Sequence, residues 1–142
     1  MELMWKKLKD WYWEFKYSRR YVPNLLDIIY DDNTSTEELD VIFKKNKNKG
    51  YICSALCRNP NTSSKVLEEI SNSSVKIYTD LNWNGIVLDY WIASNPNVAF
   101  ETLERIASCD NQLIRYRIRQ NPKCTEDLAL LLKAYEFKRN LL

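Results

Sequence analysis

Three stretches of the chain share one pattern: NPNTSSKVLEEI at 59–70, NPNVAFETLERIA at 95–107 and NPKCTEDLALLL at 121–132. Each opens with Asn-Pro, and the three align without gaps. A fourth stretch, DDNTSTEELDVIF at 31–43, keeps the same frame with two aspartates in place of Asn-Pro. Internal similarity of this kind predicts a chain built from stacked copies of one structural unit.

Apolar residues recur at fixed distances from the start of each copy. Eight and eleven positions after the start stand Leu67 and Ile70, and Ala129 and Leu132 take those positions in the last copy. Spacings of three and four residues put side chains on one face of an α-helix. A second apolar pair precedes the copies, and this predicts a further short helix there. Its members are Ile28, Leu56, Ile92 and Ile118 three residues before the start, and Ile52, Leu88 and Ile114 seven before it.

The Asn-Pro dipeptide is expected to form a sharp corner between the two helices. Proline forces the preceding residue out of the α region, so the first helix ends there. We expect the asparagine to adopt the left-handed conformation that it tolerates at helix ends. Thr34 and Thr62 then occupy the expected N-cap position of the second, longer helix. Acidic residues three positions further on, Glu37, Glu101 and Asp127, favour that helix start.

The chain resembles the leucine-rich repeat variant family in three features. These are the Asn-Pro corners, Thr62 or Val98 two residues beyond proline, and the Leu67/Ile70 pair. The resemblance covers about residues 25–135. It implies a right-handed superhelix of alternating α and 3₁₀ helices. The copies here are spaced more widely and less regularly than the family's pattern, and nothing matches the cysteine-rich segment that carries an iron–sulfur cluster in one family member. HEAT-like and Armadillo-like solenoids are the alternatives.

We therefore predict an all-α fold in two parts. Residues 25–142 form a right-handed α-solenoid of about four units, and residues 1–24 form an amphipathic helix that caps the first unit. Docking on a partner and adsorption to an anionic membrane are the alternatives for that helix. About ten inserted residues at 76–85, including Trp83, either fold back on the core or form a binding loop.

The composition excludes several classes of protein. The chain has 142 residues, 45% of them hydrophobic, and a formal net charge of +2, which is too small to imply a polyanion partner by itself. It has neither an apolar run that could span a membrane nor the apolar core of a secretory signal, so we expect a cytoplasmic location. A membrane-surface role is disfavoured.

The residue types also argue against an enzyme. With no histidine, Ser–His and Cys–His nucleophilic systems are excluded, and two glycines cannot build a phosphate-binding loop. Asp31 and Asp32 fit a degraded corner better than a metal or acid–base pair. Cys124 falls in the same position as Thr62, which favours a structural role over a catalytic one. The four cysteines are expected to be free thiols rather than metal ligands, and we predict no cofactor.

Basic and aromatic residues are the remaining candidates for a binding site. Stacking should bring Tyr90 and Tyr116 onto one surface, with Arg115 and Arg119 pointing outward beside them. Arg117 points roughly the opposite way, towards a neighbouring unit. Ordinary solvated arginines and half-buried tyrosines are the plainer interpretation. Secondary candidates are Lys44, Lys45, Lys47, Lys49, Arg58 and Trp83.

These observations predict a non-enzymatic protein-binding module. Such a module would serve as an adaptor or as a stand-alone inhibitor, of the kind encoded by phages or mobile elements. The clustered arginines favour a protein partner with an acidic surface patch. A helical-repeat protein that binds nucleic acid through its basic patches is the alternative.

Overall fold

The computed structural model describes residues 4, 6–8, 24–73 and 88–140, and throughout these ranges the regular structure is helical, with no β-strand. The predicted all-α class is thereby confirmed. The predicted N-terminal helix falls outside the described residues, apart from residues 4 and 6–8, which are helical. The insertion at 76–85, with Trp83, lies outside them altogether. Within the described ranges, no helix combines the length and hydrophobicity needed to cross a bilayer.

The helices alternate around the four corners at 31–32, 59–60, 95–96 and 121–122. Those before a corner, here called first helices, include α4, α6 and α8, and all are α-helices rather than the 3₁₀ helices that the family resemblance implied. Nor are they always shorter than the second helices, since α4 and α5 both have 9 residues. The bounds are α2 Leu25–Ile29, α3 Thr36–Lys45, α4 Gly50–Arg58, α5 Ser64–Asn72, α6 Leu88–Ser94, α7 Phe100–Ala107, α8 Gln112–Gln120 and α9 Glu126–Asn140.

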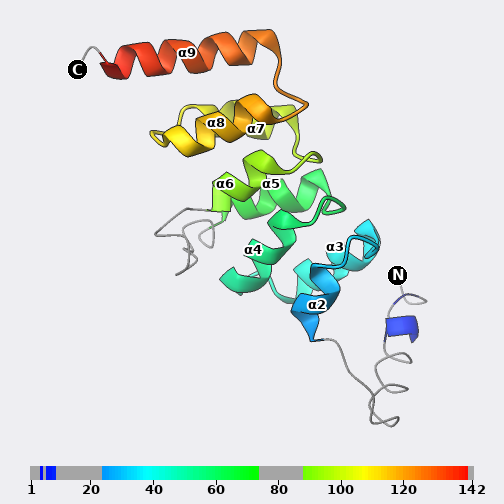
Figure 1. The fold of residues 1–142 in the computed structure, drawn as a ribbon. Coiled ribbons are helices and arrows are strands. Elements are labelled where there is room, and N and C mark those ends of the chain that lie inside the picture. Colours follow the sequence, from blue (N-terminus) through cyan, green and yellow to red (C-terminus); the bar gives the residue numbers. More distant parts are fainter. Residues whose placement is uncertain (1–3, 5, 9–23, 74–87, 141–142) are drawn as a thin grey trace.

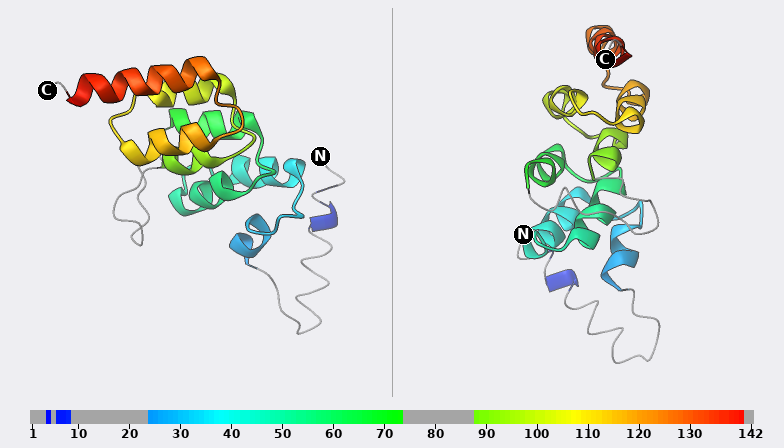
Figure 2. Two further views of the ribbon diagram at one scale, coloured as in Figure 1. Left: turned by 45° about the horizontal axis from the view of Figure 1, so that its top comes forward. Right: turned by 90° about the vertical axis from the view of Figure 1, so that its left-hand side faces the viewer.

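The helix pairs are stacked in the order of the sequence (Figure 1). The first helices pack in series, α2 against α4, α4 against α6 and α6 against α8. The right-hand view of Figure 2 shows them in one column, with the second helices in a column beside it. The long helix α9 packs on α7 and lies across the C-terminal end of the stack.

Each Asn-Pro corner is an extended turn. Asn59 has φ −82° and ψ 125°, and Asn121 has φ −73° and ψ 132°. The expected left-handed conformation is therefore wrong, and the steric effect of proline on the preceding residue accounts for the extended one. The asparagine side chain turns back on its own corner, where Oδ1 of Asn59 accepts a hydrogen bond from the N–H of Asn61 at 2.8 Å.

The same asparagine side chains also join each corner to the one before it. Nδ2 of Asn95 donates to the carbonyl oxygens of Cys57 and Asn59, at 2.9 and 2.8 Å. Asn121 does the same to Ala93 and Asn95, at 2.8 and 2.9 Å. Asn59, Asn95 and Asn121 are all buried, so these bonds satisfy backbone groups that water cannot reach.

The first corner explains why aspartate can replace asparagine there. Asn59 donates to the carbonyl oxygens of Ile29 and Asp31, at 2.6 and 3.2 Å, so this corner receives the same pair of bonds. Asp31 itself is exposed, and its Oδ1 accepts from the N–H of Asn33 at 2.9 Å. A carboxylate can make that local bond, but it has no N–H to donate to a preceding corner.

A second asparagine, two residues after the first, adds another pair of bonds between corners. Nδ2 of Asn61 donates to the carbonyl oxygens of Asp32 and Thr34, at 2.7 and 3.0 Å. Asn97 makes the equivalent bonds to Pro60 and Thr62. In the last copy Lys123 stands at this position. The sequence NPN therefore encodes contacts between neighbouring corners, in addition to the turn.

The second helices begin one residue later than the sequence suggested. The N-caps of α3 and α5 are Ser35 and Ser63, whose hydroxyls accept from the backbone N–H groups of Glu38 and Val66. Thr34 and Thr62 are buried instead, and each donates its hydroxyl hydrogen to a carbonyl six residues earlier, at 2.5 Å. The two threonines therefore tie α3 and α5 to the first helices of their own units.

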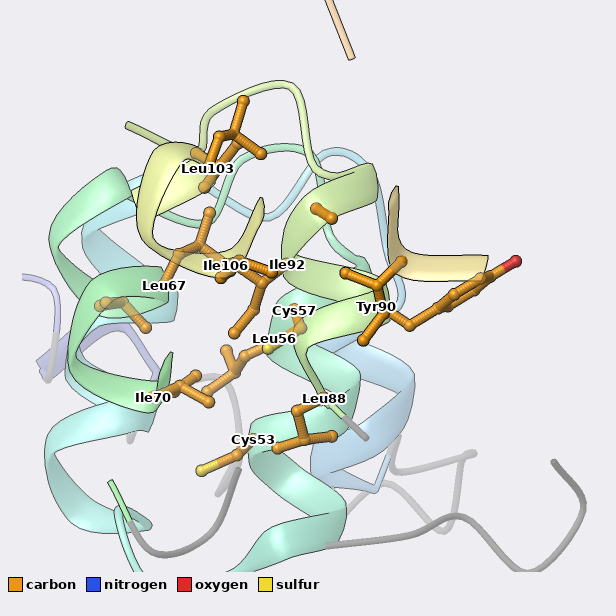
Figure 3. Close-up of a cluster of buried hydrophobic side chains, with 14 of the residues drawn as sticks. Cys53, Leu56, Cys57, Leu67, Ile70, Leu88, Tyr90, Ile92, Leu103 and Ile106 are labelled. Carbon is orange, nitrogen blue, oxygen red and sulfur yellow. The ribbon is translucent and has the colours of Figure 1, made fainter. Parts of the chain in front are cut away.

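The core consists mainly of the apolar positions that the spacing predicted. The pairs Leu67/Ile70 and Leu103/Ile106 lie together with the buried edge of the first helices (Figure 3). Ile52, Leu56, Leu88, Ile92, Ile114 and Ile118 are all buried as expected. Two positions differ: Ile29 rather than Ile28 is fully buried in α2, and Leu128 replaces Ala129 as the partner of Leu132 in α9.

Candidate protein-binding surface

The predicted site is divided by the structure into buried and exposed residues. Tyr90 is only 7% exposed, so it does not belong to an open surface. Its hydroxyl accepts a hydrogen bond from Nε of Arg117 at 2.8 Å, and the guanidinium carbon lies 4.9 Å from the centre of the ring. This contact joins α6 to α8. It agrees with the prediction that Arg117 packs against the neighbouring unit.

Arg115 is buried as well, with 4% of its surface exposed, so the expectation that it points outward is wrong. A terminal guanidinium nitrogen donates to the carbonyl oxygen of Cys109 at 2.9 Å. Its Nε lies 3.8 Å from Oε1 of Glu136. The side chain thus fills the space between α8, the preceding loop and α9, where it satisfies a backbone carbonyl.

Arg119 shares the helix face of Arg115, as their four-residue spacing predicted, and it also pairs with Glu136. Glu136 therefore holds both arginines against α9. The three charged groups meet at the junction of α8 and α9. Beside them lies a polar pocket of about 530 Å³, lined by Asp110, Asn111, Gln112, Arg115, Glu136 and Asn140.

Tyr116 is the one aromatic residue of the predicted site that is exposed, at 51%. Leu113 lies three residues before it on the same face of α8 and is 52% exposed. Asn111 starts this helix by accepting from the N–H groups of Leu113 and Ile114, at 2.9 and 3.3 Å. The two exposed side chains, here called the α8 patch, stand on a well-capped helix.

Sequence reasoning missed Leu113, although a signal was present. Leu113 stands eight residues before Asn121, and Tyr51 stands eight before Asn59; both are exposed. The same position in two copies thus carries a large apolar residue on the outside. Neither position belongs to the apolar pairs that the spacing predicted for the core. A large apolar residue outside those pairs was therefore the signal for an exposed side chain.

The exposure of Tyr116 follows from its place in the stack. In α4 and α6, the residues five before the corner are Ser54 and Tyr90, and both are buried. Ser54 lies in α4, which packs against α6, and Tyr90 lies in α6, which packs against α8. α8 is the last first helix of the described chain, so no further first helix covers Tyr116 there.

The secondary basic candidates also differ from one another. Lys44, Lys45, Lys47 and Lys49 are exposed, and Nζ of Lys47 lies 3.3 Å from Oε2 of Glu69. The guanidinium carbon of Arg58 lies 4.1 Å from the ring centre of Trp91, so this arginine packs between α4 and α6. The exposed lysines are thus concentrated at the end of α3 and in the loop that follows it.

The four cysteines are free thiols. Burial raises the pKa of Cys53 to about 11 and that of Cys57 well above its ordinary value. Burial also raises the pKa of Cys124, against a smaller opposing effect of Arg119. A raised pKa lowers the fraction of reactive thiolate, the reverse of what nucleophilic catalysis requires. No group of metal-binding side chains occurs among residues 24–73 and 88–140.

Comparison with known proteins adds no relationship: no family model, no curated protein and no solved structure matches this chain.

Proposed function

We propose that this chain is a short α-solenoid, related in its corner design to the leucine-rich repeat variant proteins, and that it acts as a non-enzymatic protein-binding module. The equivalent bonds from Asn59, Asn95 and Asn121 to the preceding corner support a single repeating unit. The column of first helices supports a stacked scaffold. Such scaffolds offer extended surfaces for recognition.

The observation that carries the proposal is the α8 patch. Tyr116 is exposed at the position where Ser54 of α4 and Tyr90 of α6 are buried beneath the next first helix, and the exposed Leu113 widens this apolar face. A partner helix that lies on α8 would continue the column and cover both side chains. Aromatic side chains at such positions are frequent interface anchors.

The charge beside the patch indicates the chemistry of the partner. Arg119 is partly exposed on α8 and forms an ion pair with Glu136, a carboxylate that the buried Arg115 also reaches. An apolar helix with acidic residues at its edge would match this surface. The protein would then act as an adaptor or inhibitor by occupying that helix.

Affinity capture with a variant pair tests this function. Tagged parent protein, a Leu113→Asp/Tyr116→Asp double variant and a Tyr30→Asp control would each be incubated with nuclease-treated lysate of the native host. Tyr30 is half exposed and directly follows α2, which lies at the opposite end of the stack, so it controls for an added surface charge. We expect the parent and the control to retain the same protein and the double variant to lose it. If the double variant still retained that protein, the α8 patch would be excluded as the binding surface.

The exposed lysines at the end of α3 support nucleic-acid binding as the second candidate. In that case binding would weaken steeply with salt, because each neutralised phosphate releases counterions. Titration of labelled single-stranded RNA at several salt concentrations measures this slope. Substitution of Lys44, Lys45 and Lys49 by Gln would reduce the slope, whereas the Leu113→Asp/Tyr116→Asp variant would leave it unchanged.

A further inference from the structure

Helix α9 is apolar on two opposite faces. Leu128 and Leu132 are buried on the inner face, where half-buried Tyr135 extends the contact with the core. On the outer face, Leu130 is 61% exposed and Phe137 is 67% exposed. Ala134 is exposed between them. A helix with solvent on its outer side ordinarily has polar residues there.

The outer residues form one continuous stripe. Leu130, Ala134 and Phe137 follow one another at spacings of four and three, which places them on a single line along the helix. Leu131 is exposed at the edge of this line. The group of these residues is here called the α9 stripe. Stripes of large apolar side chains at the end of a helical stack indicate an interface.

The charges around the stripe are segregated along the helix. Glu126 and Asp127 lie in the first turn, Lys133 lies at the middle of the helix and Lys138 in its last third; all four are exposed. Two copies of α9 placed antiparallel about Ala134 bring Asp127 of each near Lys138 of the other. A parallel pair would bring like charges together. Antiparallel packing also opposes the two helix dipoles favourably.

We propose that a second copy of this chain docks on the α9 stripe, so that two α9 helices pack antiparallel about a two-fold axis near Ala134. In that arrangement Phe137 of each copy lies beside Leu130 of the other, and the small Ala134 side chains let the helices approach closely. The stripe meets its own copy, as a two-fold interface requires, and Asp127 of each copy faces Lys138 of the other. The proposal is independent of the α8 patch.

The size of the stripe sets the strength of the dimer. A helix of 15 residues is about 22 Å long. Two such helices in contact bury less than the roughly 1,200 Å² that marks the lower end of standard stable interfaces. We therefore expect a reversible dimer with a dissociation constant in the micromolar range.

Sedimentation velocity of the full chain over a concentration series from about 1 to about 500 μM tests the proposal across the range in which such affinities are measured. We expect a monomer at the low end and a dimer at the high end. Phe137→Asp should raise the dissociation constant at least tenfold, because it buries a charge. Tyr51→Asp is the matched control, since it also replaces a half-exposed aromatic residue. A chain that stays monomeric throughout, or a dimer unaffected by Phe137→Asp, would overturn the proposal.

The contribution of these charges to the dimer is tested with two charge variants. Glu126→Lys/Asp127→Lys makes the outer surface uniformly basic, and Lys133→Glu/Lys138→Glu makes it uniformly acidic. Each variant alone should dimerise more weakly than the parent, and an equimolar mixture should recover a heterodimer. Circular dichroism confirms that α9 still folds in each variant. If the mixture associates no better than the separate variants, two α9 helices do not pair in this way.

Discussion

The middle of the stack and its C-terminal end use the same sequence pattern but are covered differently. The corner at Asn95 donates to the corner before it and accepts from Asn121 of the corner after it. Around it, the residues of α6 that face the next unit are buried. At the C-terminal end, the equivalent face of α8 and the outer face of α9 carry exposed apolar side chains. At the position of Tyr116, the same local code produces core in α4 and α6, where a further first helix follows, and open surface in α8, the last first helix among the described residues.

Burial of the asparagine amide is therefore specific to corners that have a preceding neighbour, and Asn95→Asp should show the largest effect. The carboxylate would lie against the carbonyl oxygens of Cys57 and Asn59 and could not donate to either. We expect a loss of about 4 kcal/mol or more in the free energy of unfolding, or failure to fold. Urea denaturation followed by circular dichroism measures it.

The matched control for that change is Asp31→Asn at the exposed first corner. Asparagine retains the oxygen that accepts from the N–H of Asn33, so the free energy of unfolding should change by less than about 0.5 kcal/mol. If Asn95→Asp costs no more than Asp31→Asn, the bonds between corners do not stabilise the stack.

A core truncation contrasts the buried and exposed apolar residues directly. Leu103→Ala removes a fully buried side chain from the middle of the stack and should cost about 2–5 kcal/mol. Phe137→Ala removes a larger side chain from the outer face of α9, where little packing is lost. At concentrations below dimer formation, we expect a change of less than about 0.5 kcal/mol. Similar losses from both truncations would mean that the α9 stripe is covered within the monomer.

The two arginines that reach Glu136 should also differ. Arg115→Met keeps most of the side-chain volume but removes the donor to the carbonyl of Cys109, and we expect a loss of about 1–3 kcal/mol. Arg119→Met removes a partly exposed ion pair, for which the expected loss is below about 1 kcal/mol. Thermal unfolding of the two variants under the same conditions shows which of them loses more stability. If Arg115→Met lost no more stability than Arg119→Met, the burial of Arg115 would contribute no stability.

The buried edges of the helices could be predicted from the sequence because helical periodicity is local. Leu67/Ile70 and Ile52/Leu56 are four residues apart or less, so the chain itself records that they share a face. The asparagine bonds could not be predicted in the same way. They depend on where the carbonyl oxygens of another corner lie, and that position is set by the stacking of units more than twenty residues apart.

Errors at the C-terminal end have a related cause. Ala129 fits the alignment of copies, but α9 packs on α7 without a further unit beyond it among the described residues, so the larger Leu128 is buried in its place. Arg115 was expected outside because of its charge. Its counterpart in α4, six residues before the corner, is the buried Cys53. The alignment thus contained a signal that the residue type concealed.

A small effect is expected at the buried position three residues after Asn59 and Asn95. Thr62 donates to the carbonyl of Leu56, whereas Val98 fills the same position in the next copy with a methyl group and is also fully buried. Thr62→Val should therefore fit without strain and lose one hydrogen bond. We expect a loss of about 0.5–1.5 kcal/mol in the free energy of unfolding.

Thr62→Ser supplies the control for that substitution, because it keeps the hydroxyl and removes a buried methyl group. If the hydrogen bond to Leu56 dominates, Thr62→Val is the more destabilising of the two; if the methyl group dominates, Thr62→Ser is. We expect a difference of less than about 1 kcal/mol, because a net hydrogen bond and one buried methyl group contribute similar free energies. Urea denaturation of both variants in one series resolves it. A loss above about 3 kcal/mol for Thr62→Val would show that threonine and valine are not interchangeable here, and that the copies at 59 and 95 differ in their corner geometry.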